Sequence, residues 1–392
     1  MVAPKLRFQE FDGDWESKKL KDLTDILKCG VASTPKYVTE GGYPFLSAQN
    51  ISRNGEMNYS KVNNISDDFY KKISKTKLLK GDILYSRVGA SYGVAAIFDR
   101  EEEYGVYVSL TQIRVNDTLN NIFLKQFLNS PKARIQAEQG VFQGGGVQNL
   151  NVGVVEEFNL TLPSKQEQTK IASFLAAVDE KITQLTQKHQ LLSQYKQGMM
   201  QKLFSQQIRF KADDGSEFGE WEETTLGEIG TFKSGQGFPE QFQGGKDGIP
   251  FFKVSDMNIL GNEKIMKVAN NYVNSEAITK MKAKVIDNEA IIFAKVGAAI
   301  FLERKRLAKN FLIDNNMMAY LSNQKTNIMF LKQFLDNIKL SKFVQVGALP
   351  SYNSSDLAII PISLPCLEEQ TKIANFLSAI DQKIEVVAQQ IE

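Results

Sequence analysis

Histidine, cysteine and long apolar runs are scarce in this chain of 392 residues. His189 is the single histidine, so any catalytic scheme that needs imidazole as a general base must use that residue. Cys29 and Cys366 lie far apart and lack the spacing of a metal site, and no His/Cys cluster offers one. No apolar run reaches the ~18 residues of a membrane span. Residues Met1 to Glu16 have no signal-peptide core, and a reducing cytoplasm is the simplest compartment.

Net charge is also small, at +2. This balance neither requires nor excludes a nucleic-acid ligand. A DNA-binding protein of this composition would need locally basic faces or a partner that supplies phosphate contacts. The length allows two domains, each able to bury a core of its own.

The sequence repeats itself once, at about half its length. Residues 162–175 and 364–377 share ten of fourteen positions: LPSKQEQTKIASFL and LPCLEEQTKIANFL. The hexapeptide FLKQFL occurs at 123–128 and again at 330–335, and Trp15 with Leu20 recurs as Trp221 with Leu226. The period is much longer than the ~20–50 residues of a solenoid, so we interpret the chain as a duplicated domain.

Each copy has the same order of parts. Short apolar runs separated by Gly, Asn and Pro predict buried strands, a short helix follows, and a strand ending in Leu-Pro leads into a long polar helix. We therefore predict an α+β protein: a mixed domain at 1–161, a helix at 162–209, a second mixed domain at 210–363 and a second helix at 364–392. Two antiparallel helices would separate the domains in a pseudo-two-fold arrangement.

Apolar residues on both long helices alternate in steps of four and three, which is a heptad pattern and predicts a coiled-coil seam. His189 and Lys196 occupy inward positions, where polar residues fix register, so we interpret His189 as a seam residue rather than a catalyst. The second helix is shorter than the first by roughly sixteen residues, and we expect a truncated C-terminus. The predicted seam consists of Ile171, Leu175, Val178, Ile182, Leu185, His189, Leu192, Lys196, Met199, Leu203, Ile373, Leu377, Ile380, Ile384, Val387 and Ile391. An ordinary helical linker with a frayed tail is the alternative.

Three motifs resemble catalytic loops. Residues 89–93 match the G-x-S-x-G nucleophile elbow, but the serine is not repeated in the second copy and His189 lies on the long helix, so a tight turn is favoured. Residues 142–146 match a methyltransferase loop, but they follow a helical stretch, and the chain has no D-P-P-Y or N-P-P-F tetrapeptide. Residues 244–246, GGK, lack the rest of a P-loop.

Two variable mixed domains, each followed by a near-identical helix that begins with Leu-Pro and continues Glu-Gln-Thr-Lys-Ile, resemble the specificity subunits of type I restriction-modification systems. The resemblance covers essentially the whole chain. It implies that each mixed domain is a target-recognition domain for one half of a split DNA site. It also implies that the helices set the spacer and dock the partners. The short second helix departs from the pattern and puts full docking in doubt.

The resemblance further implies the partners: double-stranded DNA, two methyltransferase subunits and, in the restriction form, motor-endonuclease subunits. S-adenosylmethionine would belong to the methyltransferase, and ATP and Mg to the motor subunit. This chain would carry no cofactor, metal or catalytic residue. A coiled-coil interaction scaffold without DNA specificity is the alternative function.

Base edges are read by amide, hydroxyl and guanidinium groups, so polar loop residues at similar places in the two copies are the candidate DNA contacts. In copy one they are Lys36, Ser47, Gln49, Asn50, Arg87, Ser91, Tyr92, Gln143, Gln148 and Asn149. In copy two they are Lys253, Ser255, Asp256, Lys295, Asn316, Ser351 and Tyr352.

Overall fold

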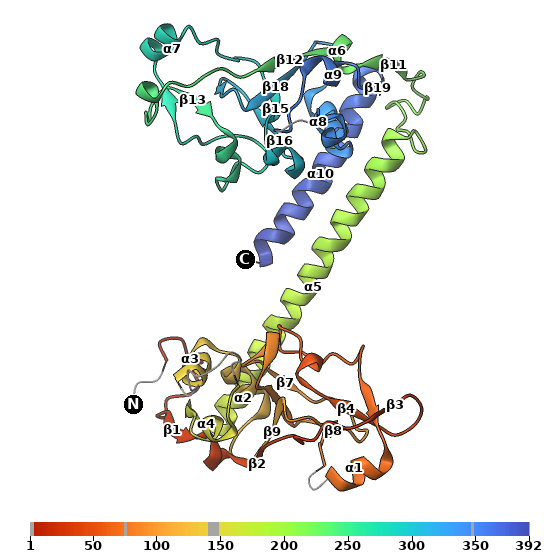
Figure 1. The fold of residues 1–392 in the computed structure, drawn as a ribbon. Coiled ribbons are helices and arrows are strands. Elements are labelled where there is room, and N and C mark those ends of the chain that lie inside the picture. Colours follow the sequence, from red (N-terminus) through yellow and green to blue (C-terminus); the bar gives the residue numbers. More distant parts are fainter. Residues whose placement is uncertain (1–3, 74–76, 140–148, 346–348, 392) are drawn as a thin grey trace. The chain divides into compact units, whose positions relative to one another are not determined.

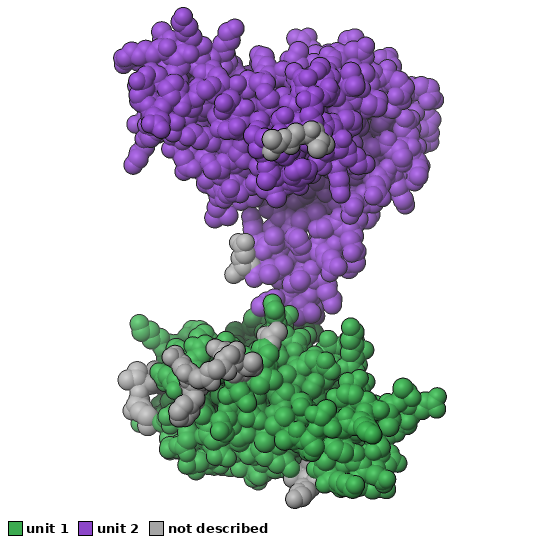
Figure 2. Space-filling view, viewed as in Figure 1, with its two compact units in different colours: residues 1–181 green, residues 182–392 purple. Residues whose placement is uncertain are grey.

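A computed structural model of the chain describes residues 4–73, 77–139, 149–345 and 349–391. The chain forms two compact units, Met1–Lys181 and Ile182–Glu392, coloured separately in Figure 2. The long helix predicted over 162–209 is the continuous helix α5, Lys165–Phe204, which belongs to both units. No helix within the described residues combines the length and apolar character needed to cross a membrane.

Unit 1 contains two four-stranded sheets, ordered β2-β9-β6-β7 and β3-β5-β4-β8, and the strand pair β1-β10 (Figure 1). Its strands are β1 (Glu16–Lys19), β2 (Thr24–Cys29), β3 (Tyr37–Val38), β4 (Tyr43–Leu46), β5 (Asn63–Ile65), β6 (Ile83–Ser86), β7 (Ala95–Ile97), β8 (Gly105–Val106), β9 (Leu110–Val115) and β10 (Asn159–Leu162). Its helices before α5 are α1 (Asp67–Ile73), α2 (Asn121–Leu128), α3 (Pro131–Gln139) and α4 (Val152–Glu156), with 3-10 turns η1 (Leu20–Leu23), η2 (Ala48–Asn50) and η3 (Gly89–Ser91).

Unit 2 repeats this plan with sheets β12-β18-β15-β16 and β14-β13-β17 and the pair β11-β19. Its strands are β11 (Glu222–Thr225), β12 (Gly230–Ser234), β13 (Ile249–Phe252), β14 (Tyr272–Val273), β15 (Ala290–Ala294), β16 (Lys305–Ala308), β17 (Leu312–Ile313), β18 (Met317–Ser322) and β19 (Pro361–Leu364). Its helices after α5 are α6 (Leu226–Ile229), α7 (Ser275–Met281), α8 (Ile328–Asn337), α9 (Ser354–Ala358) and α10 (Leu367–Ile391), with 3-10 turns η4 (Glu240–Phe242), η5 (Val254–Asn258), η6 (Ala298–Leu302) and η7 (Leu340–Phe343). The mixed architecture predicted for both copies is confirmed.

In each unit we call the sheet that contains β6 or β15 the large sheet and the sheet that contains β4 or β13 the small sheet, and we call β6 and β15 the central strands. All residues of β6 and of β15 are buried, because each strand pairs on both sides and packs on both faces. The small sheet of each unit contains one parallel pair, β4 with β8 and β13 with β17. Repeated sequence thus produces repeated strand order and strand direction.

The helix after the large sheet is also set by sequence. The side chains of Asn120 and Asn327 accept hydrogen bonds from the first backbone N–H groups of α2 and α8, so each helix begins at a capping asparagine. The repeated FLKQFL segments lie in these helices and bury Phe123 and Phe330 in the unit cores. The sequence pattern predicts helices around Ile122–Asn129 and Phe330–Ile338, so the observed bounds agree to within two residues.

Two matched glycines mark a close approach of the backbone. A Cβ on Gly30 would lie 2.2 Å from the carbonyl oxygen of Val106, and one on Gly235 would lie 1.8 Å from that of Asp314. A side chain there would disturb the parallel bridge that follows each glycine, Val31 with Tyr107 and Gln236 with Asp314. Both glycines follow the first strand of the large sheet, where the chain crosses to the small sheet.

Candidate nucleic-acid interface

In unit 1, the candidate Arg87 joins the end of β6 to two loops. Its Nε donates to the carbonyl of Leu150 at 2.6 Å and its Nη1 to that of Val108 at 2.9 Å. The backbone N–H of Leu150 donates a hydrogen bond to the carbonyl of Arg87. This bond holds the candidate Asn149 beside the end of the strand. The guanidinium therefore fixes the loop that precedes α4.

The candidates of turn η2 lie at the same end of β6. Ser91 Oγ donates to the carbonyl of Ala48 at 3.0 Å, and Ser109 Oγ accepts from Ala48 N–H, while the Ser109 carbonyl accepts from Arg87 N–H. Ser47 and Asn50 close the turn through a capping bond from the Ser47 N–H to Asn50 Oδ1. Four separate segments of unit 1 are thus brought together.

Unit 2 builds an equivalent cluster around Lys295 at the end of β15. The Lys295 N–H donates to the Asn316 carbonyl at 2.7 Å, and its own carbonyl accepts from Tyr352 N–H at 3.0 Å. Val296 and Ser351 form an isolated antiparallel bridge. The Lys295 ammonium donates to Ser234 Oγ at 3.0 Å in a solvent-exposed bond, and Lys295 is only partly buried where Arg87 is buried.

Turn η5 of unit 2 corresponds to η2 of unit 1, with Asp256 in the place of Asn50. Lys253 N–H donates to Asp256 Oδ2 at 2.8 Å, and Asp256 Oδ1 accepts from the side chain of Asn270 at 2.6 Å. Nearby, Asp314 accepts from the Asn316 backbone and side chain. Burial raises the pKa of Asp314, and the bonds from Asn316 oppose that rise. The cluster therefore combines one surface ammonium with several polar groups whose orientations are fixed.

Six candidate DNA contacts differ from the others in burial. Their side chains are buried: Asn50, Arg87, Ser91, Tyr92, Asp256 and Tyr352. Asn50 and Asp256 use their polar atoms on neighbouring loops, and Ser91 and Arg87 bond to backbone carbonyls. Direct contact of these six residues with a base stays a prediction, as it does for the other candidates.

The remaining candidates stay predictions of DNA contact. The exposed ones are Lys36, Gln49, Asn149, Ser255 and Asn316, and the partly buried ones are Ser47, Lys253, Lys295 and Ser351. Lys36 precedes β3 and does not belong to the unit 1 cluster. Gln143 and Gln148 lie outside the described residues, as does the glycine-rich motif at 142–146.

The G-x-S-x-G motif at 89–93 is a turn, as predicted. It forms η3 between β6 and β7, and the Ser91 hydroxyl lies 3.1 Å from Ser86 Oγ in a buried pair. The chain's single histidine, His189, lies on α5 in the other unit, so unit 1 holds no imidazole for this hydroxyl. Within the described residues there is no group of three or more His, Cys, Asp or Glu that could hold a metal ion.

Each unit is anchored to its long helix by a carboxylate that sequence reasoning missed. In unit 1, Arg7 donates from Nε and Nη2 to Glu167, both at 2.7 Å, and the Glu167 side chain is almost completely buried. Gln168 accepts from Asn120 N–H and donates to the Pro163 carbonyl, which ties α5 to the start of α2. The repeated Glu-Gln dipeptide was the available signal.

Unit 2 has the same anchor with one more bond. Arg209 donates to Glu369 at 3.2 and 2.8 Å, and the indole N–H of Trp221 donates to the same carboxylate at 3.0 Å. Gln370 accepts from Asn327 N–H, as Gln168 does from Asn120. The residues repeated in the sequence therefore make repeated contacts.

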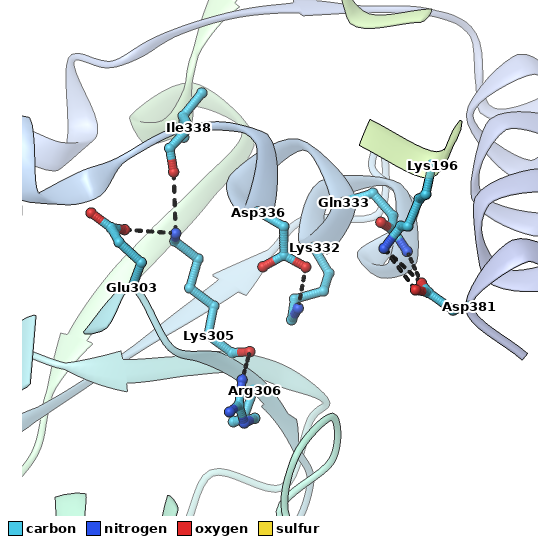
Figure 3. Close-up of polar contacts among 9 residues, drawn as sticks. All are labelled: Lys196, Glu303, Lys305, Arg306, Lys332, Gln333, Asp336, Ile338 and Asp381. Carbon is cyan, nitrogen blue, oxygen red and sulfur yellow. Dashed lines mark hydrogen bonds and ion pairs between the residues drawn. The ribbon is translucent and has the colours of Figure 1, made fainter. Parts of the chain in front are cut away.

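Polar residues also join the two long helices inside unit 2 (Figure 3). Lys196 of α5 forms an ion pair with Asp381 of α10 at 2.8 Å, and Gln333 of α8 donates to the same carboxylate at 3.0 Å. Beside them Lys332 pairs with Asp336; burial lowers the pKa of Lys332, and the carboxylate opposes this. The predicted polar position Lys196 is thus paired across the helices.

The rest of the predicted seam is unevenly covered. In unit 2 the seam residues Leu203, Ile373, Leu377 and Ile380 share one core cluster, with Met199 and Ile384 packed against it. Leu185 and Val387 are buried, and His189, Leu192 and Ile391 are partly buried. Ile171 and Leu175 are also partly buried, but Val178 and Ile182 are exposed. A continuous coiled coil over the whole seam stays a prediction.

Comparison with known proteins finds relatives for both halves of the repeat. Residues 12–194 and 219–392 match a family described as Type I restriction modification DNA specificity domain, so each half of the repeat matches it once. The type I restriction enzyme MjaX specificity subunit ascribed to Methanocaldococcus jannaschii is 28% identical over 97% of this chain and 90% of its own length. The MjaVIII specificity subunit of the same organism is 25% identical at the same coverage.

Solved structures give a matching fold. The S subunit of the type I restriction-modification system from M. genitalium superposes with a TM-score of 0.60, at 18% identity, over 100% of this chain and 95% of its own. A chain from a type I R-M complex superposes with a TM-score of 0.56, at 16% identity, over 97% of this chain and 94% of its own. The resemblance noted from the sequence is confirmed.

Proposed function

Because the chain belongs to the family of type I restriction-modification DNA specificity proteins, we propose that it recognises a split, asymmetric DNA sequence, with each unit reading one half. Specificity subunits are the non-catalytic members of these systems, and the catalytic activities reside on other subunits. One observation supports the two-part site: each unit gathers polar residues from separate loops at the end of its central strand, but with different side chains.

Recognition of two different half-sites requires different side chains on the same repeated fold. Arg87, Asn50 and Asn149 of unit 1 correspond in place to Lys295, Asp256 and the 351–352 segment of unit 2. A different set of donors and acceptors reads a different base sequence, because groove edges are distinguished by their hydrogen-bond pattern.

The test is methylation mapping of genomic DNA from cells that carry this chain with its modification subunit. We expect one asymmetric motif whose two specified parts are separated by unspecified bases. A palindromic or uninterrupted motif would overturn the split-site proposal. If the complex neither methylates nor retards duplex DNA, the scaffold alternative is favoured.

The long helices are proposed to set the spacer. Helix α5 contains 40 residues and is therefore about 60 Å long at ~1.5 Å per residue. An insertion of four residues between the exposed Ala176 and Ala177 would lengthen it by about 6 Å and leave Lys196 paired with Asp381. We expect the methylated motif to gain one or two unspecified bases and keep both half-sites. An unchanged spacer would show that the helix is not a ruler.

Helix α5 is also the proposed docking site for the modification subunits. Leu191 and Tyr195 are 64% and 51% exposed and lie one helical turn apart, beside Lys188 and Leu192. Exposed apolar residues grouped on one helix face are typical of protein interfaces. Leu191→Ala with Tyr195→Ala should reduce co-purification of the modification subunit. Val386→Ala, which removes a similarly exposed side chain from α10, is the matched control.

In this assignment, S-adenosylmethionine binds the modification subunits, and ATP and Mg bind the motor subunits of a restriction complex. Binding of S-adenosylmethionine by the isolated chain would contradict that assignment. Calorimetric titration of the chain with and without its modification subunit would measure it.

A further inference from the structure

A groove of about 480 Å³ lies in unit 2 where strand β12 ends beside the turn that joins α7 to β15. Lys233, Ser234 and Gln236 line one side, and Lys282 and Lys284 line the other. The floor is apolar and buried, since it is made by Leu312 of β17 and its neighbours. None of these residues was a candidate from the sequence.

The groove carries uncompensated positive charge. Lys233, Lys282 and Lys284 are exposed, and none of the three forms an ion pair within the described part of unit 2. The corresponding α1–β6 segment of unit 1 differs, because Lys77 pairs with Glu103 and Lys80 with Glu101. The chain as a whole has a net charge of only +2, so three unpaired lysines around one hollow form a local basic face.

The groove adjoins the candidate base-reading cluster. Ser234 lines the groove and accepts the hydrogen bond from the Lys295 ammonium. Lys295 in turn bonds through its backbone to Asn316 and Tyr352. A strand of DNA that follows the groove would therefore pass directly beside the groups proposed to read bases.

The backbone of both groove walls is held in a defined conformation, by strand contacts on one side and by the end of helix α7 on the other. Gly235 approaches the Asp314 carbonyl so closely that no Cβ could fit, and Gln236 forms a parallel bridge with Asp314. Lys282 sits in the left-handed conformation that ends α7, at φ 49°. The lysine stems therefore start from fixed points, as a preformed binding surface requires.

We propose that this groove binds the sugar-phosphate backbone of the duplex whose bases unit 2 reads; this inference rests on the proposed function. Ammonium groups on long side chains neutralise phosphates as point charges. Phosphate contacts fix the register of a protein on DNA but carry no direct sequence information. The groove accordingly positions the half-site, and the cluster around Lys295 discriminates its bases.

The test compares the complex containing Lys233→Gln, Lys282→Gln and Lys284→Gln with the wild-type complex on a duplex carrying the methylated motif. Affinity should fall on the order of tenfold or more at moderate salt, because phosphate contacts dominate affinity. The slope of log affinity against log salt should decrease by about three, one for each lysine. The methylated motif should stay the same. An unchanged affinity and slope, with the wild-type complex still binding, would overturn the groove and leave the proposed function intact.

Two controls distinguish the effect of the groove lysines from a general loss of positive charge. Gln replacement of Lys325, Lys339 and Lys383, which are exposed in unit 2 but line no part of the groove, should leave the salt slope within error of wild type. Arginine at the three groove positions should retain the wild-type slope. The proposal is contradicted if the first control lowers the salt slope as much as the groove variant does. It is also contradicted if arginine at the groove positions lowers the slope as much as glutamine. If the wild-type complex itself does not bind DNA, the proposed function fails instead.

Discussion

The two units attach to their long helices through the same residues but in different surroundings. In unit 2 the apolar face of α10 is covered, with Ile373 and Leu377 completely buried beside Met200 and Leu203 of α5. In unit 1 the equivalent face of α5 borders an apolar groove of about 360 Å³, and Phe174 is 54% exposed. Leu6 and Phe8 line that groove together with Ile171 and Leu175.

This difference separates what a motif specifies from what its context adds. The Arg–Glu pair and the Gln bonds form in both units, because each needs only the residues repeated in the sequence. Burial of the helix face depends on a second helix lying against it, which the described part of unit 2 supplies from α5. The anchor therefore forms wherever the repeated residues are present. The stability gained from apolar burial depends in addition on a neighbouring helix.

The largest expected effect is in the apolar contacts. Leu377→Ala should destabilise unit 2 by about 4 kcal/mol, because it opens a cavity in a closed core. Leu175→Ala should destabilise unit 1 by only about 1 kcal/mol, since that side chain already borders a groove. Urea unfolding followed by tryptophan fluorescence can measure both, because Trp15 reports on unit 1 and Trp221 on unit 2. Equal losses would remove the distinction between covered and uncovered faces.

A smaller difference is expected at the anchoring carboxylates. Glu369→Gln should cost about 3 kcal/mol, because it leaves a mostly buried guanidinium without its counter-charge. Glu167→Gln should cost about 1 kcal/mol less, since Glu369 also accepts the Trp221 bond. The same unfolding measurement in urea tests the order. A larger loss for Glu167→Gln would show that the Arg7 pair is the stronger anchor.

The smallest effect is expected at the two tryptophans. Trp221→Phe should lower stability by about 1 kcal/mol through loss of the bond to Glu369. The Trp15 indole N–H is buried and has no partner among the described residues, so Trp15→Phe removes an unsatisfied donor and should be nearly neutral. Thermal unfolding by circular dichroism measures both variants. A clear loss in Trp15→Phe alone would mean that the packing of the Trp15 ring contributes more to stability than the Trp221 bond to Glu369.

Much of the fold was predictable because it depends on local pattern. The short helices that contain FLKQFL, the buried strands β6 and β15 and the long helix within 162–209 follow from sequence period. The caps at Asn120 and Asn327 were not predicted. The repeat supplied an internal check, because each prediction had to hold in both copies.

The site was less predictable because it depends on distant pairings. Arg7 and Glu167 are 160 residues apart, and nothing in either segment identifies the other as its partner. Lys233 and Lys282 reach one groove only through the strand order of the sheet. Asn50 and Asp256 are predicted DNA contacts, and the sequence does not indicate that their side chains are buried and bond to neighbouring loops.

The central claim is that each unit reads its own half of the DNA site. The most direct test replaces residues 210–363 with the same segment of a family member of different specificity and maps methylation in cells that also carry the modification subunit. The account predicts a hybrid motif, with one half from each parent and the original half retained for unit 1. A motif in which both halves change, or neither does, would contradict it.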